Sequence, residues 1–258
     1  MGKKDLSFIP GLSDDERILL RNILDKYERA NRICKPLFSF FLDERKQMLA
    51  KTALDSIKAD RYIFEGGYQD AQRKIIVFYP EHYYENEPQV PVKSITFTYR
   101  AVDKLTHRDF LGALMSLDIK RECIGDILVG EGKCCVFVYE TVLQDVLYIT
   151  KIGRVGVKAS EGFDVSVTPE NSFKELSLTV SSLRIDGVVS AAAGISREKA
   201  AALIKSSLVS LNYKEVSSAS QKIDIGGTFS ARGYGKYELI SCRETKKGRL
   251  NIVVKKYL

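Results

Sequence analysis

The order of strands and helices predicted between residues 93 and 158 constrains the fold of this 258-residue chain more than any other feature. Ser94–Tyr99 (SITFTY) alternates in the manner of a half-buried strand. In chain order the patterns predict strand 94–99, helix 108–117, strands 124–129 and 133–139, helix 140–149 and strand 154–158. This β-α-β-β-α-β order is typical of the ferredoxin-like fold, which RNA-recognition modules share with many enzymes.

A mainly helical segment is predicted before this pattern. Ser13-Asp14-Asp15-Glu16 has the form of a capping box, and apolar residues at helical spacing follow it until Pro36. A second helix is predicted from about Asp43 to Ile57, and the apolar run 75–79 predicts a buried strand. The polar stretch 81–91 contains two prolines, so it indicates a loop at a domain boundary.

The last third of the chain has a pattern of its own. A polar connector at 162–173 precedes two predicted helices at about 182–193 and 196–207. Strands are predicted at about 208–211, 228–231, 237–244 and 249–255. The whole chain is therefore predicted to be an α+β protein with an α-rich domain at 1–90, a ferredoxin-like domain at 91–173 and a small αβ domain at 181–258.

Positive charge is concentrated in the last of these predicted domains. Residues 181–258 contain 14 Lys and Arg against 6 Asp and Glu, a balance of +8, whereas residues 1–180 contain 26 against 27, a balance of −1. A basic domain on a near-neutral body indicates a polyanionic partner, because each neutralised phosphate releases condensed counterions. An ordinary solvated basic surface is the alternative.

Several classes of protein are disfavoured by composition. The longest apolar runs are far shorter than the roughly 20 residues of a membrane-spanning helix. The first ten residues have no apolar core of the kind found in secretion signals. The five cysteines form no C-x-x-C pair, so neither a disulfide framework nor a zinc ribbon is expected. We therefore expect a cytoplasmic protein that binds no membrane.

His107-Arg108-Asp109 is the one motif that suggests catalysis. A protein kinase is disfavoured, because its downstream Asn, D-F-G and Gly-rich loop are absent. The motif also approximates the catalytic Asp motif of pseudouridine synthases without its intervening Leu. Alternatively, Thr106 caps a helix whose first turn contains Asp109, and we favour this interpretation. Gly130-Glu131-Gly132-Lys133 lacks the spacing of a phosphate loop, and we expect no catalytic residue, metal, cofactor or small-molecule substrate.

The basic C-terminal part offers the residues of a phosphate-binding surface. Ser196 is a plausible N-cap, and Arg197 and Lys205 follow on one face of the predicted helix. Arg184 opens the preceding helix, where Asp186 could hold it in place. The RNA-binding residues that we predict are Arg184, Ser196, Arg197, Lys205, Lys214, Arg232, Lys236, Arg243, Lys246, Lys247 and Arg249.

The motifs of this region resemble a known RNA-binding domain. Residues 183–186 (LRID), 196–197 (SR), 203–204 (LI), 209–212 (VSLN) and 230–235 (SARGYG) are similar to the domain named after small-subunit ribosomal protein S-four. Ser207 and Tyr213 stand where that family usually has glycine, and Gly226-Gly227 replaces its usual G-D. The resemblance covers about residues 181–258 and implies a small αβ domain that binds RNA.

Upstream motifs extend the resemblance over nearly the whole chain. Residues 107–115 (HRDFLGALM), 119–122 (IKRE), 124–127 (IGDI) and 151–155 (KIGRV), with Gly66-Gly67-Tyr68 and Arg73-Lys74, resemble the signature of the YlmH family. The resemblance implies a bacterial cytoplasmic protein associated with the large ribosomal subunit and with quality control of stalled translation. Family members are thought to hold peptidyl-tRNA while alanines are added to the stalled chain, and the family has been linked to cell division.

The resulting hypothesis is a non-enzymatic factor that docks on rRNA and tRNA of the large (50S) ribosomal subunit through its C-terminal domain. Two alternatives stay open at this point. One is an RNA-modifying enzyme of the pseudouridine-synthase type, which would need Asp109 exposed in a cleft. The other is a cell-division scaffold that binds protein. The sequence gives no indication of the oligomeric state.

Overall fold

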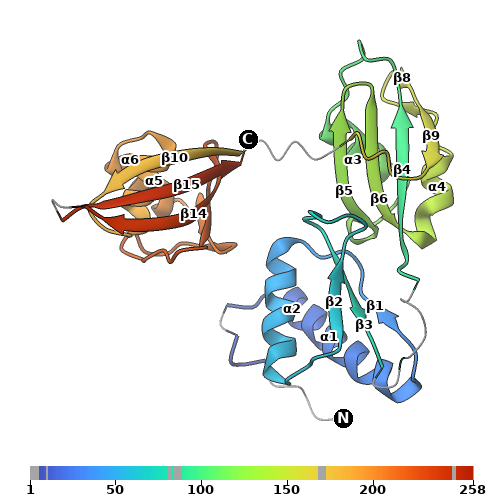
Figure 1. Ribbon diagram of the computed structural model, residues 1–258, viewed down its shortest axis with the longest axis horizontal. Coiled ribbons are helices and arrows are strands. Elements are labelled where there is room, and N and C mark those ends of the chain that lie inside the picture. Colours follow the sequence, from blue (N-terminus) through green and yellow to red (C-terminus); the bar gives the residue numbers. More distant parts are fainter. Residues whose placement is uncertain are drawn as a thin grey trace. The chain divides into compact units, whose positions relative to one another are not determined.

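The computed structural model describes residues 6–9, 11–80, 83, 89–167, 173–245 and 248–257, and it is a mixed α+β structure (Figure 1). The chain divides into two compact units, Met1–Pro169 and Glu170–Leu258. None of the helices within the described ranges combines the length and apolar composition needed to cross a bilayer.

Two helices and a three-stranded sheet form the beginning of the first unit. Helix α1 (Asp14–Ile33) starts at the predicted capping box, in which Ser13 and Glu16 exchange backbone-to-side-chain hydrogen bonds of 3.0 and 3.2 Å. Helix α2 (Glu44–Ser56) is capped by Asp43. Strands β1 (Leu37–Phe38), β2 (Tyr62–Glu65) and β3 (Ile75–Phe78) form an antiparallel sheet in the order β1-β3-β2. Only β3 was predicted, because β1 and β2 are short and flanked by polar residues.

A four-stranded antiparallel sheet forms the rest of the first unit. It consists of β4 (Val92–Thr98), β5 (Ile124–Gly130), β6 (Lys133–Tyr139) and β9 (Lys158–Glu161), in the spatial order β5-β6-β4-β9. Helix α3 (His107–Met115) follows β4, and a 3-10 turn (Arg121–Cys123) precedes β5. A second 3-10 turn (Glu140–Val142) leads into helix α4 (Leu143–Leu147). Residues of both helices share a core with β4, β5 and β6.

The predicted position of the last strand of this segment was wrong. Residues 154–158 were expected to complete the sheet, but the strand that pairs with β4 is β9, with Thr98 opposite Lys158. The preceding residues form a separate hairpin of β7 (Lys151–Ile152) and β8 (Val155–Gly156). Gly153, with a φ of +58°, permits the tight turn between these two short strands.

Strands β3 and β6 are buried on both faces, and this double burial joins the two sheets. Ile76 and Phe78 pack with α1 and α2, whereas Ile75 and Val77 pack with Cys135 and Phe137 of β6. Cys134, Val136 and Val138 face the α3–α4 side. Unbroken apolar runs such as Ile75–Phe78 and Cys134–Val138 are typical of strands covered on both faces.

A polar network holds the same junction. The Asp126 carboxylate accepts hydrogen bonds from the Tyr68 hydroxyl (2.8 Å) and from the backbone N–H groups of Gln72 (2.6 Å) and Arg73 (3.1 Å). The guanidinium of Arg73 donates to the backbone oxygens of Phe41, Arg121 and Ile124, at 2.8 to 3.4 Å. Burial and the nearby Arg73 lower the pKa of Arg121 to about 10. Tyr68, Arg73, Arg121 and Asp126, which belong to the upstream family resemblance, therefore meet in one packed junction.

We expect Asp126→Ala to lower the free energy of unfolding of the first unit by about 2 kcal/mol, because three donors would lose their acceptor. Thermal unfolding of the full chain followed by calorimetry would measure this loss. Asp145→Ala, at an exposed position of α4, is the matched control and should change stability by less than about 0.5 kcal/mol. Equal stability of the two variants would contradict a structural role for the network.

The second unit is a six-stranded antiparallel sheet with two helices on one face (Figure 1). Its spatial order is β10-β15-β14-β13-β11-β12. The helices are α5 (Ile185–Ala193) and α6 (Arg197–Lys205); the strands are β10 (Phe173–Val180), β11 (Val209–Leu211), β12 (Lys214–Glu215), β13 (Thr228–Ala231), β14 (Gly235–Glu244) and β15 (Leu250–Tyr257). Strand β10 was not predicted, although Leu176, Leu178 and Val180 alternate with polar residues and pack on the core.

Candidate nucleic-acid interface

Two of the predicted RNA-binding residues, Arg184 and Arg197, meet at one carboxylate. Both guanidinium groups bind Asp186 through two hydrogen bonds each, at 3.3 and 3.3 Å from Arg184 and at 3.0 and 3.1 Å from Arg197. Asp186 also accepts a hydrogen bond from the backbone N–H of Gly187 at 2.8 Å. One acidic residue in the first turn of α5 thus fixes two arginines from the starts of adjacent helices.

Asp186 is buried, and the arginines that it holds remain accessible. The Asp186 side chain is 7% exposed, while those of Arg184 and Arg197 are 42% and 50% exposed. Burial by itself would raise the pKa of Asp186, but the hydrogen bonds from Arg197 and Arg184 outweigh it and hold this pKa below its usual value. The group therefore carries two cations and one anion near neutral pH, and its excess positive charge faces solvent.

Helix α6 begins next to this arginine pair. Ser196 is its N-cap, and its hydroxyl accepts a hydrogen bond from the backbone N–H of Lys199 at 3.1 Å. Because Ser196 and Arg197 are exposed, the positive end of the helix dipole adds to the charge of the arginines. Lys205 is exposed at the other end of α6, about 12 Å from Arg197 along the helix axis.

Five further predicted residues, Lys214, Arg232, Lys236, Arg243 and Arg249, lie on the sheet and its turns. Arg232 is exposed in the turn before β14, Arg243 is exposed on β14, and Arg249 is exposed just before β15. Lys214 lies on the edge strand β12, and Lys236 lies on β14. Lys246 and Lys247 fall outside the described residues. The structure therefore brings Arg184, Ser196 and Arg197 together, leaves Lys205 at the far end of α6, and distributes the other described cations over the sheet and its turns.

Asp109, the residue of the enzymatic alternative, stabilises the start of a helix. Its carboxylate accepts hydrogen bonds from the backbone N–H of Thr106 at 2.8 Å and from the Thr106 hydroxyl at 2.6 Å. These hydrogen bonds lower the pKa of Asp109, which is exposed at the first turn of α3. The structure therefore confirms that Thr106 is the N-cap of α3 and that Asp109 lies in its first turn, where the Asp109 carboxylate supplies the capping hydrogen bonds.

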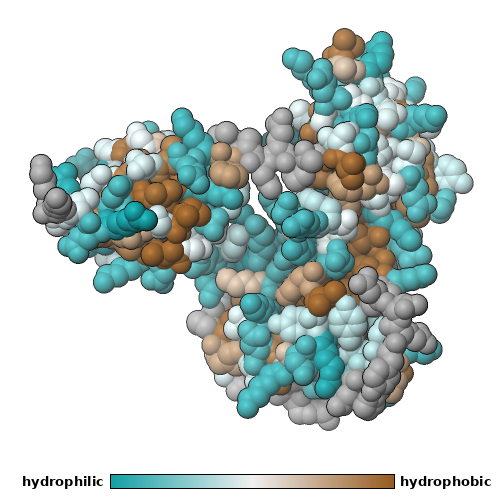
Figure 2. Space-filling view, viewed as in Figure 1, coloured by the Kyte–Doolittle hydropathy of each residue, from teal (hydrophilic) through white to brown (hydrophobic). Residues whose placement is uncertain are grey.

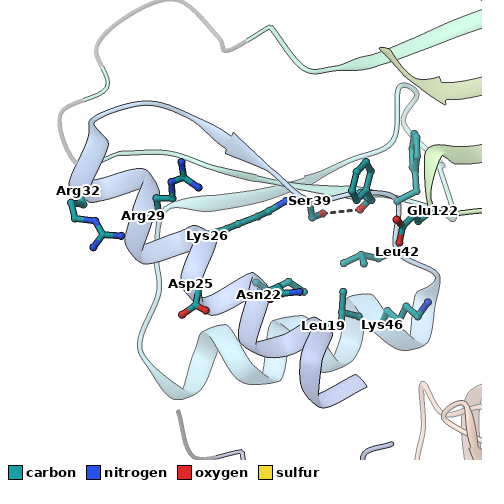
Figure 3. A pocket seen from close by; sticks show the side chains of 13 residues that line it. Leu19, Asn22, Asp25, Lys26, Arg29, Arg32, Ser39, Leu42, Lys46 and Glu122 are labelled. Atoms are coloured by element: carbon teal, nitrogen blue, oxygen red, sulfur yellow. Dashed lines mark hydrogen bonds between the residues drawn. The ribbon is translucent and has the colours of Figure 1, made fainter. Parts of the chain in front are cut away.

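The first unit contains a basic pocket whose residues were not among those predicted from the sequence. The cavity, of about 500 Å³, lies between α1, α2 and the loop that contains Phe40 and Phe41 (Figure 3). Its cationic lining residues are Lys26, Arg29, Arg32 and Lys46, and its acidic ones are Asp25 and Glu122. Lys26 donates to the backbone oxygen of Phe38 at 2.6 Å, and burial lowers its pKa despite the nearby Glu122. Cations three residues apart in the predicted first helix, which is α1 in the structure, were the available signal.

Comparisons with known proteins show what this chain is similar to. Residues 85–163 match a family model described as "Putative RNA-binding domain in YlmH". A Bacillus subtilis (strain 168) protein, "Ribosome-associated protein quality control protein P2", is 30% identical over 245 residues, which cover 92% of this chain and 94% of the relative. The solved structure "Cell division protein ylmH from Streptococcus pneumoniae" has a TM-score of 0.49 and 22% identity, covering 60% of this chain and 95% of that one.

Proposed function

The chain belongs to the YlmH family, and from this premise we propose that it is a non-catalytic RNA-binding factor of the large ribosomal subunit. It docks on rRNA and tRNA and stabilises peptidyl-tRNA while stalled chains are tailed with alanine. The relative from Bacillus subtilis, which is named for ribosome-associated quality control, supports the biological context. The cytoplasm is the compartment in which we propose that it acts.

The observation that carries this proposal is the arginine pair on Asp186. One buried carboxylate orients the two guanidinium groups, and the two arginine side chains are about half exposed. Each arginine can therefore bind a phosphate at a small further cost in side-chain entropy. Ser196 is the N-cap of the adjacent helix α6, and Arg197 is the first residue of that helix. A single rRNA or tRNA backbone can satisfy both arginines and the helix start.

We propose that three segments of the chain have different roles. Residues 170–258 act as an S-four-type domain that supplies the phosphate contacts. The segment of β4, α3, β5, β6, α4 and β9 is a ferredoxin-like module, and its strand order and antiparallel pairing support this assignment. Residues 1–90 pack against that module through the junction around Asp126.

RNA crosslinked to the full chain in living cells tests the proposal. We expect the recovered RNA to be enriched in large-subunit rRNA and tRNA, relative to their abundance in the same cells. A folded protein that recovers neither would contradict the proposal and would favour a protein-binding scaffold of the kind linked to cell division.

Substitution of Asp109 separates the proposal from the pseudouridine-synthase alternative. Asp109→Asn should leave ribosome binding and the pseudouridine content of rRNA and tRNA unchanged, because the Asn side chain can still accept a hydrogen bond from Thr106. The melting temperature should fall by a few degrees at most. Loss of a specific pseudouridine in cells that express only this variant would contradict the non-catalytic assignment.

A further inference from the structure

The sheet face of the second unit that lies away from α5 and α6 carries alternating aromatic rings and lysines. The Lys255 Nζ lies 4.0 Å from the ring centroid of Phe173 and 5.3 Å from that of Tyr257. The Lys236 Nζ lies 5.2 Å from the ring centroids of both Tyr257 and Tyr213. These five residues form a continuous row, which we call the cation–aromatic ladder.

The strand register places the ladder on the face opposite the helices. Tyr237, Leu239, Ile252 and Val254 enter the core that the sheet shares with α5 and α6. Side chains alternate along a strand, so Lys236, Lys255 and Tyr257 point to the other side. Within the described residues, no helix of this unit covers that side, and Figure 1 shows both helices behind β10, β15 and β14.

The ladder runs across the strands at one end of the sheet. Phe173 is opposite Tyr257 in the β10–β15 pair, and Tyr257 is opposite Lys236 in the β15–β14 pair. Tyr213 lies in the turn between β11 and β12, so the three rings extend over about 20 Å at 4.7–4.9 Å per strand. Sheets of RNA-recognition modules use aromatic rings in this way to stack two or three unpaired bases.

The chemistry of the ladder matches single-stranded RNA more closely than an apolar protein partner. Phe173 is 45% exposed, and a half-exposed ring offers its surface to a base. Glu175 and Glu238 lie opposite Lys255 on β10 and β14 and balance the charge of the two lysines, so the contact that the ladder offers is stacking on its rings. Ile240, 40% exposed, lies further along β14, where apolar side chains gather over β14 and β15 (Figure 2).

We infer that this sheet face binds unpaired bases of RNA, while the arginines on Asp186 bind phosphates on the helical side. The inference rests on the proposed RNA-binding function and adds a second surface to it. Two RNA contacts from opposite faces would let this one small unit bridge two RNA segments.

Fluorescence anisotropy of the full chain with labelled single-stranded octauridine and with an RNA duplex of equal length tests the inference. Tyr213→Leu/Tyr257→Leu should weaken binding of the single strand at least tenfold and leave duplex binding within twofold. Tyr213→Phe/Tyr257→Phe should retain the wild-type affinity, because the rings remain. Tyr148→Leu, at a tyrosine 80% exposed in the first unit, is the control and should bind like the wild type.

A folded Tyr213→Leu/Tyr257→Leu protein with unchanged affinity for octauridine would overturn the inference and would favour a protein partner on this face. An equal loss for single strand and duplex would also overturn it, because base stacking requires unpaired bases. Neither outcome would affect the arginine pair, whose binding is measured separately on ribosomal subunits.

Discussion

The affinity for purified large ribosomal subunits, measured by co-sedimentation, should fall about 100-fold when Arg184→Gln, Arg197→Gln and Asp186→Asn are combined. Each arginine can form charge-assisted hydrogen bonds to phosphate, worth about 1.5–3 kcal/mol, and 1.4 kcal/mol corresponds to a factor of ten. The expected loss is therefore larger than for any single exposed lysine of the chain.

The third substitution keeps the variant folded. Asp186 is buried, and removal of both arginines would leave its carboxylate without its cations, at a cost of about 3–5 kcal/mol. Asparagine at position 186 removes that charge and can still accept the hydrogen bond from the backbone N–H of Gly187. Circular dichroism and thermal unfolding of the triple variant should match the wild type within a few degrees.

Salt dependence distinguishes a phosphate contact from a general effect of charge. Loss of two phosphate contacts should flatten the plot of log affinity against log salt by about 1.5. Lys51→Gln lowers the net charge by the same single unit at an exposed position of α2, and it should bind like the wild type. Unchanged co-sedimentation of the folded triple variant would refute the arginine pair as the principal RNA contact.

The residues of the arginine pair could be selected from the sequence, because Arg184, Asp186 and Arg197 are close together along the chain. Asp186 is two residues from Arg184 and eleven from Arg197, and the helix starts that position them have local signals such as the N-cap Ser196. The balance of positive charge pointed to the same segment. Helices and strands with caps or unbroken apolar runs, such as α1 and β6, were likewise predicted to within about two residues.

The cation–aromatic ladder could not be predicted, because its members are brought together only by strand pairing. Phe173 and Tyr257 are far apart in sequence and become neighbours through the register of β10 and β15. Phe173 was assigned to the end of the polar connector, and the alternating pattern of residues 174–180 does not show which strand they pair with. The same limitation hid the junction at Asp126, which gathers residues from several segments.

That junction also explains why glycine occupies position 67. A Cβ atom there would lie 2.6 Å from the ring of Phe137, closer than real Cβ contacts, and the backbone φ of +93° is strained for any other residue. Phe137 cannot move easily, because it stacks on Tyr68 at 4.9 Å and packs against Phe163 at 5.2 Å between ring centroids. The residue type at position 67 is thus set by close packing between the two sheets.

We therefore expect Gly67→Ala to lower the free energy of unfolding of the first unit by about 3 kcal/mol, from backbone strain and overpacking together. For a unit of this size, calorimetry of the full chain should show a fall in its Tm of about 10 °C. Gly112→Ala is the matched control, because nothing lies within 4 Å of its added Cβ in the middle of α3, and it should raise stability by up to about 1 kcal/mol. If Gly67→Ala were as stable as Gly112→Ala, the two sheets could not be packed as closely as the structure shows.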